Sequence, residues 1–199
     1  MQYIFFTGAP GSRWSGVSQV FRNTLEDVDN SDCTPKHSYR HHLYSGHVGN
    51  YYGPGMLYGD WLGTELGTRA QWEAEIARSY SDNTRPVKLI LSHNFAYYLD
   101  ALTDTFPDSK LVLCYRPTEL CYHWWHAAGG WDISYPDYRW YQDNNRMKAE
   151  IHRQNLEILK FAEKHKLALK QPNIDFFRQY FDVDRDFVFD KDVNVAVRG

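Results

Sequence analysis

A short loop near the amino end of the chain combines residue types suited to binding an anion. Residues 8–15 read Gly-Ala-Pro-Gly-Ser-Arg-Trp-Ser and stand between an apolar run and a segment with helical periodicity. Glycines let backbone N–H groups converge on a negative charge, and a helix start adds roughly half a positive charge. In the phosphate-loop pattern GxxxxGK[ST], Gly8 and Ser15 match, whereas Arg13 replaces the second glycine and Trp14 the lysine. The pattern predicts a phosphate-binding loop; the alternative is a plain turn between a strand and a helix.

The second chemical candidate is a histidine at the end of another apolar run. His93 follows residues 87–91, which read Val-Lys-Leu-Ile-Leu. Imidazole has an unperturbed pKa near 6.5, so it can accept a proton at neutral pH. We predict that His93 is a general base; the alternative is a hydrogen-bonded histidine of the core.

A third candidate is an arginine at the end of a third apolar run. Arg116 follows residues 111–115, and a guanidinium binds phosphate through two parallel hydrogen bonds. The alternative is an ion pair between Arg116 and Glu119. His123 could donate a hydrogen bond to the same phosphate, or it could pack among the aromatic residues beside it, which are Tyr122, Trp124 and Trp125.

The elements that must position these residues repeat one pattern. Three apolar runs of about five residues are each followed by a turn and a helical segment. The expected strands cover residues 3–7, 87–91 and 111–115, and the expected helices cover residues 15–28, 94–106 and 117–128. Runs that are apolar on both faces are typical of buried parallel strands. We therefore predict a three-layer α/β/α fold of the P-loop type, with a central parallel sheet flanked by helices and its ligands beyond the carboxyl ends of the strands.

The remaining segments are less regular. Residues 30–67 are rich in Gly, Tyr and His without a sustained period, which predicts a long functional loop. Its four histidines (His37, His41, His42 and His47) fit no standard zinc spacing. Further helices are expected at 68–80, 138–165 and 174–181, and a strand-like run at 186–189. No linker interrupts the chain, so we expect one domain over residues 1–199.

Composition limits the classes of function. The chain has 199 residues and a net charge of −3, which disfavours nonspecific nucleic-acid binding. No apolar run approaches the roughly 20 residues of a membrane span, and the first residues do not read as a signal peptide. Three cysteines form no disulfide framework. We expect a cytoplasmic protein that binds neither nucleic acid nor membrane; the oligomeric state is not predicted.

Three segments in order resemble the sulfotransferase family, whose members use 3′-phosphoadenosine 5′-phosphosulfate (PAPS). The family's first loop reads roughly PKSGTT, and residues 10–15 of this chain occupy it. Pro10, Ser12 and Ser15 are acceptable matches, while Gly11 replaces the family's lysine. In the family this loop holds the 5′-phosphosulfate, so the resemblance implies that Arg13 supplies the lost positive charge.

The other two segments carry the rest of the likeness. The strand that ends in Ser92-His93 resembles the family's strand ending in Thr-His, in which the histidine is the general base; Leu91 stands where the family often has a lysine. The run from Leu111 to Glu119 resembles the family's strand followed by R-N-P-x-D, one residue shorter. On this alignment Arg116 and His123 occupy the positions that contact the 3′-phosphate.

The resemblance implies transfer of a sulfuryl group from PAPS to a hydroxyl or amine acceptor, with adenosine 3′,5′-bisphosphate as product and no metal. His93 and Arg13 are the expected catalytic residues. The acceptor is expected to be a small molecule or a carbohydrate, bound by residues 37–61. The expected cofactor-binding residues are Gly8, Pro10, Gly11, Ser12, Arg13, Trp14, Ser15, Arg116 and His123. Two alternatives remain: a small-molecule or nucleotide kinase using ATP and magnesium, against which the missing lysine at Trp14 argues, and a non-catalytic nucleotide-binding module.

Overall fold

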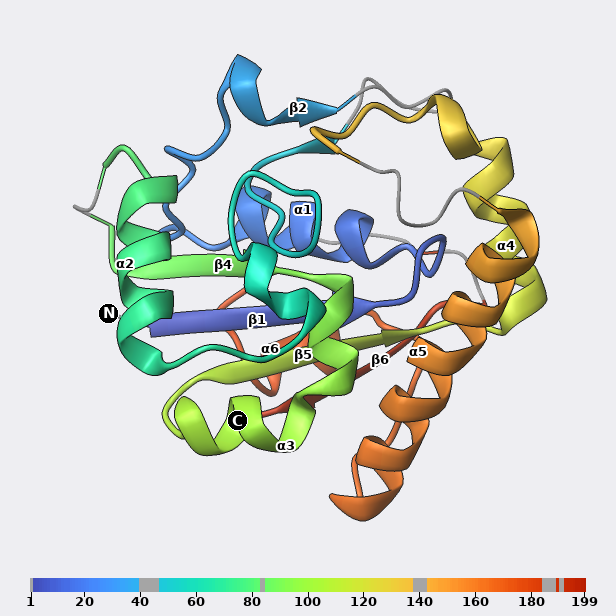
Figure 1. The fold of residues 1–199 in the computed structure, drawn as a ribbon. Coiled ribbons are helices and arrows are strands. Elements are labelled where there is room, and N and C mark those ends of the chain that lie inside the picture. The colour runs from blue at the N-terminus through green and yellow to red at the C-terminus, as the bar shows by residue number, and fades with distance from the viewer. Residues whose placement is uncertain (1, 40–46, 83–84, 138–142, 184–188, 190–191) are drawn as a thin grey trace.

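A four-stranded sheet forms the centre of the molecule (Figure 1). The computed structural model describes residues 2–39, 47–82, 85–137, 143–183, 189 and 192–199. The strands occur in the order β4-β1-β5-β6, and β1, β4 and β5 are parallel while β6 is antiparallel to β5. Their bounds are Gln2–Gly8 for β1, Val87–Leu91 for β4, Lys110–Tyr115 for β5 and Asn194–Arg198 for β6. The three predicted strands are confirmed, and β6 was not predicted.

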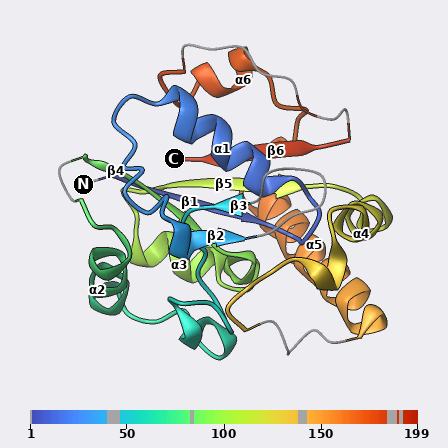
Figure 2. The ribbon, with the colours of Figure 1, turned by 90° about the horizontal axis from the view of Figure 1, so that it is seen from above.

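Helices cover both faces of this sheet (Figure 2). The residues of β1 alternate between the faces: Ile4 and Phe6 pack with α1 and α6, whereas Phe5 packs with α2, α3 and α5. The helices are α1 (Trp14–Thr24), α2 (Arg69–Ser79), α3 (Leu99–Thr105), α4 (Thr118–Ala127), α5 (Asn144–Lys164) and α6 (Ile174–Arg178). Strands buried on both faces explain the nearly continuous apolar runs. The structure is therefore a mixed α/β fold around a mostly parallel sheet.

Several helices differ in extent from the prediction. The helix expected to reach residue 28 ends at Thr24, because the chain then extends and Val28 forms a parallel bridge with Val87 at the edge of β4. The helix expected at 94–106 is divided into a 3₁₀ segment, η3 (His93–Tyr97), and α3. Most of the strand expected at 186–189 lies outside the described residues. The other short elements are η1 (Pro35–His37), β2 (Ser38–Tyr39), β3 (His47–Val48), η2 (Asp60–Gly63) and η4 (Gly130–Asp132).

The segment that follows β3 and contains Tyr51 and Tyr52 lies against the carboxyl end of β4. Tyr51 forms a parallel bridge with Leu91, and the Tyr52 amide donates a hydrogen bond to the Leu91 carbonyl at 2.8 Å. This contact brings the segment rich in tyrosine to the same edge of the sheet as the loop after β1.

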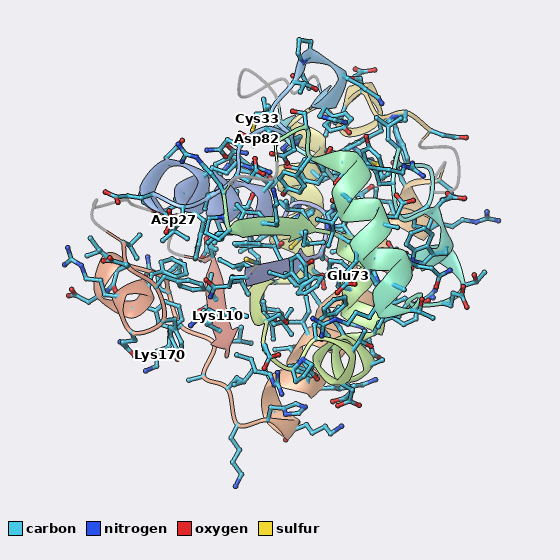
Figure 3. All side chains as sticks on the ribbon, turned by 90° about the vertical axis from the view of Figure 1, so that its left-hand side faces the viewer. Asp27, Cys33, Glu73, Asp82, Lys110 and Lys170 are labelled. Atoms are coloured by element: carbon cyan, nitrogen blue, oxygen red, sulfur yellow. The ribbon has the colours of Figure 1, made fainter. Side chains whose placement is uncertain are left out.

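Some charged side chains are exposed at the surface, among them those of Asp27, Glu73 and Lys170 (Figure 3). In the part of the chain that the structure describes, we find no helix with the length and apolar character that a membrane crossing requires.

Candidate functional site

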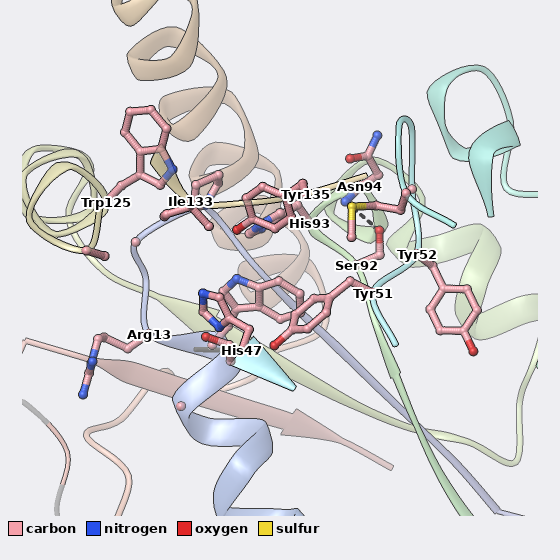
Figure 4. A pocket seen from close by; sticks show the side chains of 18 of the residues that line it. Arg13, His47, Tyr51, Tyr52, Ser92, His93, Asn94, Trp125, Ile133 and Tyr135 are labelled. Atoms are coloured by element: carbon pink, nitrogen blue, oxygen red, sulfur yellow. Dashed lines mark hydrogen bonds between the residues drawn. The ribbon is translucent and has the colours of Figure 1, made fainter. Parts of the chain in front are cut away.

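A cavity of about 380 Å³ lies at the carboxyl ends of β1 and β4 (Figure 4). The loop after β1 leads to α1 on one face of the sheet, and the loop after β4 leads to η3 and α3 on the other. Two loops that diverge in this way leave a crevice between them, which is where open α/β sheets bind ligands. Polar groups from both loops border the cavity, among them Arg13, Ser15, Ser92, His93 and Asn94.

The loop after β1 presents the start of α1 to the cavity. Gly11 and Arg13 both have left-handed backbones, with φ of 79° and 72°, and the side chain of Arg13, the N-cap residue, makes no capping hydrogen bond to α1 within the described residues. The first N–H groups of a helix have no intrahelical acceptor. Those of α1 belong to Trp14, Ser15 and Gly16, which border the cavity. The loop therefore has the composition and the position of an anion-binding site.

The predicted loop residues divide into two groups. Pro10, Gly11, Arg13, Trp14 and Ser15 line the cavity, whereas Gly8 and Ser12 are buried and do not line it. A Cβ atom on Gly8 would collide with the Ser12 hydroxyl, which explains the glycine at that position.

Gly11 lies against the backbone of α4. A Cβ atom at this position would overlap the carbonyl oxygen of Cys121, and its φ of 79° is itself unfavourable for other residues. The lysine that the family's loop carries therefore cannot stand at position 11 on this backbone. The positive charge in this loop comes from Arg13, two residues later.

His93 is held by the loop itself. Its Nδ1 lies 2.5 Å from the Gly8 carbonyl oxygen, and the Trp14 ring packs on the imidazole edge-to-face with centroids 4.5 Å apart. A carbonyl can only accept a hydrogen bond, so Nδ1 carries the proton and Nε2 is the basic nitrogen. Burial lowers the pKa of His93 from its ordinary value to about 4. The imidazole is consequently neutral at pH 7, and its Nε2 carries no proton.

Arg116 is buried at the end of β5 with unused donors. Its side chain is among the buried groups, at 8% exposure, and within the described residues its Nε and Nη1 have no hydrogen-bond partner. Its backbone carbonyl accepts bonds from Asn155 Nδ2 at 2.8 Å and Cys121 Sγ at 3.2 Å. Glu119, the alternative partner, instead pairs with Lys148 at 2.7 Å. Buried donors without acceptors are costly, and an anionic ligand would satisfy them.

The two arginines share one aromatic neighbour. The Arg13 guanidinium carbon lies 4.1 Å from the ring centroid of Trp124, and that of Arg116 lies 5.6 Å from it. Arg116 itself does not line the cavity. His123 is exposed on α4 and does not line the cavity either, so the structure does not place it beside the loop.

Part of the segment 37–61 forms one wall of the cavity. His47, Val48, Tyr51, Tyr52, Gly53, Pro54 and Met56 line it. His37 does not: its Nδ1 lies within hydrogen-bond distance of the Asp32 carbonyl and the Thr34 hydroxyl. His41 and His42 lie outside the described residues. No group of three potential metal ligands occurs among the residues that the structure does describe.

A buried ion pair holds this wall in place. Arg22 of α1 donates two hydrogen bonds of 2.7 Å to the carboxylate of Asp32, which also accepts the Asn50 amide at 2.8 Å. The nearby Asp32 charge raises the pKa of Arg22 despite the opposing effect of burial. The pair anchors the chain one residue before Tyr51, and so positions the aromatic wall against β4.

Other residues that line the cavity were not predicted as such. Ile133 and Tyr135 come from the segment after α4, and Gln19 comes from the second turn of α1. Tyr135 stacks on Tyr39 with centroids 5.5 Å apart. No local pattern marks these residues, because they reach the cavity only through the packing of distant segments. Trp124 and Trp125, noted in the sequence for their aromatic character, also line the cavity.

Comparison of the chain with protein families, curated proteins and solved structures finds no match.

Proposed function

We propose that the protein transfers a sulfuryl group from PAPS to an acceptor, on a three-layer α/β/α fold of the P-loop type. The observation that carries the proposal is the hydrogen bond between His93 Nδ1 and the Gly8 carbonyl. This bond joins a neutral base to the loop that has the features of an anion site. A base adjoining a bound anionic donor is what group transfer to an acceptor requires.

The residues of the chain fit PAPS through backbone and side-chain donors that come from two strand ends. The N–H groups at the start of α1 and the Arg13 side chain would hold the 5′-phosphosulfate. The Arg116 guanidinium, which lies 5.6 Å from the ring centroid of the cavity-lining Trp124, would hold the 3′-phosphate. When bound, PAPS supplies an electrophilic sulfuryl group and a phosphate leaving group.

His93 and Arg13 would then act on opposite sides of the reaction. Nε2 of His93 would take the proton of the acceptor as its oxygen bonds to sulfur. Arg13 and the loop N–H groups would stabilise the charge that develops on the 5′-phosphate as its bond to sulfur breaks. Such preorganised donors commonly supply the largest part of catalysis, and a positioned base contributes about 10²- to 10⁴-fold.

The cavity walls limit the acceptor. Aromatic rings of the cavity walls come from Trp14, Tyr51, Trp124, Trp125 and Tyr135. Aromatic faces stack on flat or apolar groups. The positive charge of Arg13 disfavours a protonated amine. We therefore propose a small acceptor that presents a hydroxyl group, either a small organic molecule or a sugar.

A calorimetric titration tests the proposal by comparing adenosine 3′,5′-bisphosphate with ATP plus magnesium. We expect the protein to bind the bisphosphate more tightly than ATP with magnesium. Arg116→Gln should weaken bisphosphate binding by about 10- to 100-fold, because hydrogen bonds to a charged group are lost. Arg153→Gln is the matched control, because Arg153 is exposed on α5. Binding of adenosine 5′-phosphate should change little in either variant.

A transfer assay with labelled PAPS completes the test. His93→Asn should abolish transfer to an acceptor and leave bisphosphate affinity within about threefold. Preference for ATP with magnesium would instead support a kinase, and tight bisphosphate binding without transfer to any of a panel of phenols and sugars would support a binding module. Either result would overturn the proposed activity.

A further inference from the structure

Trp124 is the one ring in the described structure that both candidate anion-binding arginines contact. Arg13 approaches it from the loop after β1, and Arg116 approaches it from the end of β5. The guanidinium carbons are therefore no farther apart than the sum of their 4.1 Å and 5.6 Å distances from the ring centroid. Both guanidinium groups thus lie near the same indole ring of α4.

Both arginines are held in unfavourable states. Arg13 has a left-handed backbone, which a side chain with a Cβ atom adopts only where its surroundings require it. Arg116 is buried, and its Nε and Nη1 have no hydrogen-bond partner within the described residues. A tryptophan face attracts a guanidinium through its quadrupole, and a planar contact restricts a flexible side chain. The ring therefore offsets part of the repulsion between the arginines and fixes their orientation.

We propose that Trp124 is a positioning residue that sets the separation of the two arginines, so that the site prefers two phosphates on the 3′ and 5′ carbons of a ribose to the 2′,5′ arrangement or to a single phosphate. This inference rests on the proposed function and specifies how its donor is recognised. A nucleotide with a single phosphate engages one arginine and gains less from the preorganised pair. A nucleotide with its second phosphate on the 2′ carbon presents a different separation from one with its second phosphate on the 3′ carbon.

The test is calorimetric titration of three probes: adenosine 3′,5′-bisphosphate, adenosine 2′,5′-bisphosphate and adenosine 5′-phosphate. Trp124→Leu removes the ring, and Trp124→Phe keeps an aromatic face. Trp131→Leu is the matched control, because Trp131 is 39% exposed and does not line the cavity. All titrations are made at one ionic strength, because phosphate binding depends on salt.

Removing the ring should reduce the selectivity of the site. We expect Trp124→Leu to weaken binding of the 3′,5′-bisphosphate by about tenfold and binding of the monophosphate by about threefold. The bisphosphate engages both of the arginines that the ring orients, whereas the monophosphate engages one. The variant's preference for the 3′,5′- over the 2′,5′-isomer should fall by a similar factor. Trp124→Phe should stay within about threefold of the wild type for every probe, and the Trp131 variant should match the wild type.

A cycle of variants tests the coupling directly. Arg116→Gln should cost less bisphosphate affinity in the Trp124→Leu background than in the wild type, because the ring no longer preorganises Arg116. Equal costs in both backgrounds would overturn the inference. So would a Trp124→Leu variant that weakens the bisphosphate and the monophosphate by the same factor, or a Trp124→Phe variant as weak as Trp124→Leu.

The failure of this inference is distinguishable from failure of the proposed function. A wild-type protein that binds the bisphosphate no better than the monophosphate would contradict the proposed function. A clear wild-type preference that Trp124→Leu leaves intact would contradict only the role of Trp124. If Trp124→Leu does not fold by circular dichroism, Trp124→Gln, a good helix former at a part-exposed position, decides the same comparison.

Discussion

His93 should make the stability of this protein depend on pH. Burial lowers the pKa of the folded imidazole to about 4, whereas an unfolded histidine titrates near 6.5. Between these values the unfolded chain binds a proton that the folded protein does not. Stability contributed by the neutral imidazole is therefore present above pH 6.5 and is lost as the pH falls toward 4.

The size of the effect follows from the shift. A difference of about 2.5 pKa units corresponds to about 3 kcal/mol in total, of which about 2 kcal/mol is lost between pH 7 and pH 5. His93→Asn removes the titrating group and keeps an N–H donor for the Gly8 carbonyl. The free energy of unfolding of this variant should thus fall by about 2 kcal/mol less than that of the wild type over the same interval.

Urea unfolding at pH 7, 6 and 5, followed by tryptophan fluorescence, measures this difference. Subtracting the variant from the wild type cancels the carboxyl groups common to both. His152→Asn is the control, because His152 is exposed on α5. Parallel pH profiles for the wild type and His93→Asn would refute the reasoning, since they would show that the folded imidazole accepts a proton as readily as an unfolded one.

Two further pairs of substitutions test the packing around the cavity. Gly11→Ala should lower the free energy of unfolding by more than about 2 kcal/mol, because its Cβ would overlap the backbone of α4, whereas Gly16→Ala in α1, where a Cβ meets open space, should raise it by up to about 1 kcal/mol. Tyr52→Phe should lower the free energy of unfolding by about 1 kcal/mol, because it removes the 2.5 Å hydrogen bond to Ser79. Tyr51→Phe should leave that free energy unchanged or raise it, because the Tyr51 hydroxyl is buried without a partner among the described residues. Urea denaturation measures all four; equal effects within either pair would contradict the corresponding contact.

The ends of the parallel strands were predictable because their signals are local. Each buried strand is a short apolar run that a turn interrupts, and this pattern located β1, β4 and β5 within about one residue. Parallel strands present their carboxyl ends at one edge, so the loop after β1 and His93 were expected to meet there. Their hydrogen bond confirms that proximity.

Other features depend on contacts between distant segments. The chain order does not show that β6 pairs with β5, although the alternating valines of residues 193–197 are a weak signal of a strand. His123 matched a phosphate-binding position in sequence, yet the rotation of α4 leaves it exposed and turns Trp124 toward the arginines instead.

The amino-acid sequence by itself determined where the strands end and which chemical groups follow them, because strand burial and turn formation depend on neighbouring residues. Only the tertiary structure decided the tautomer and pKa of His93, the burial of Arg116 without partners, and the meeting of two arginines on Trp124. Desolvation and ring contacts act over a few ångströms between residues that can be a hundred positions apart. Their outcome is therefore set by how the helices and loops pack together, and a pattern along the chain does not contain it.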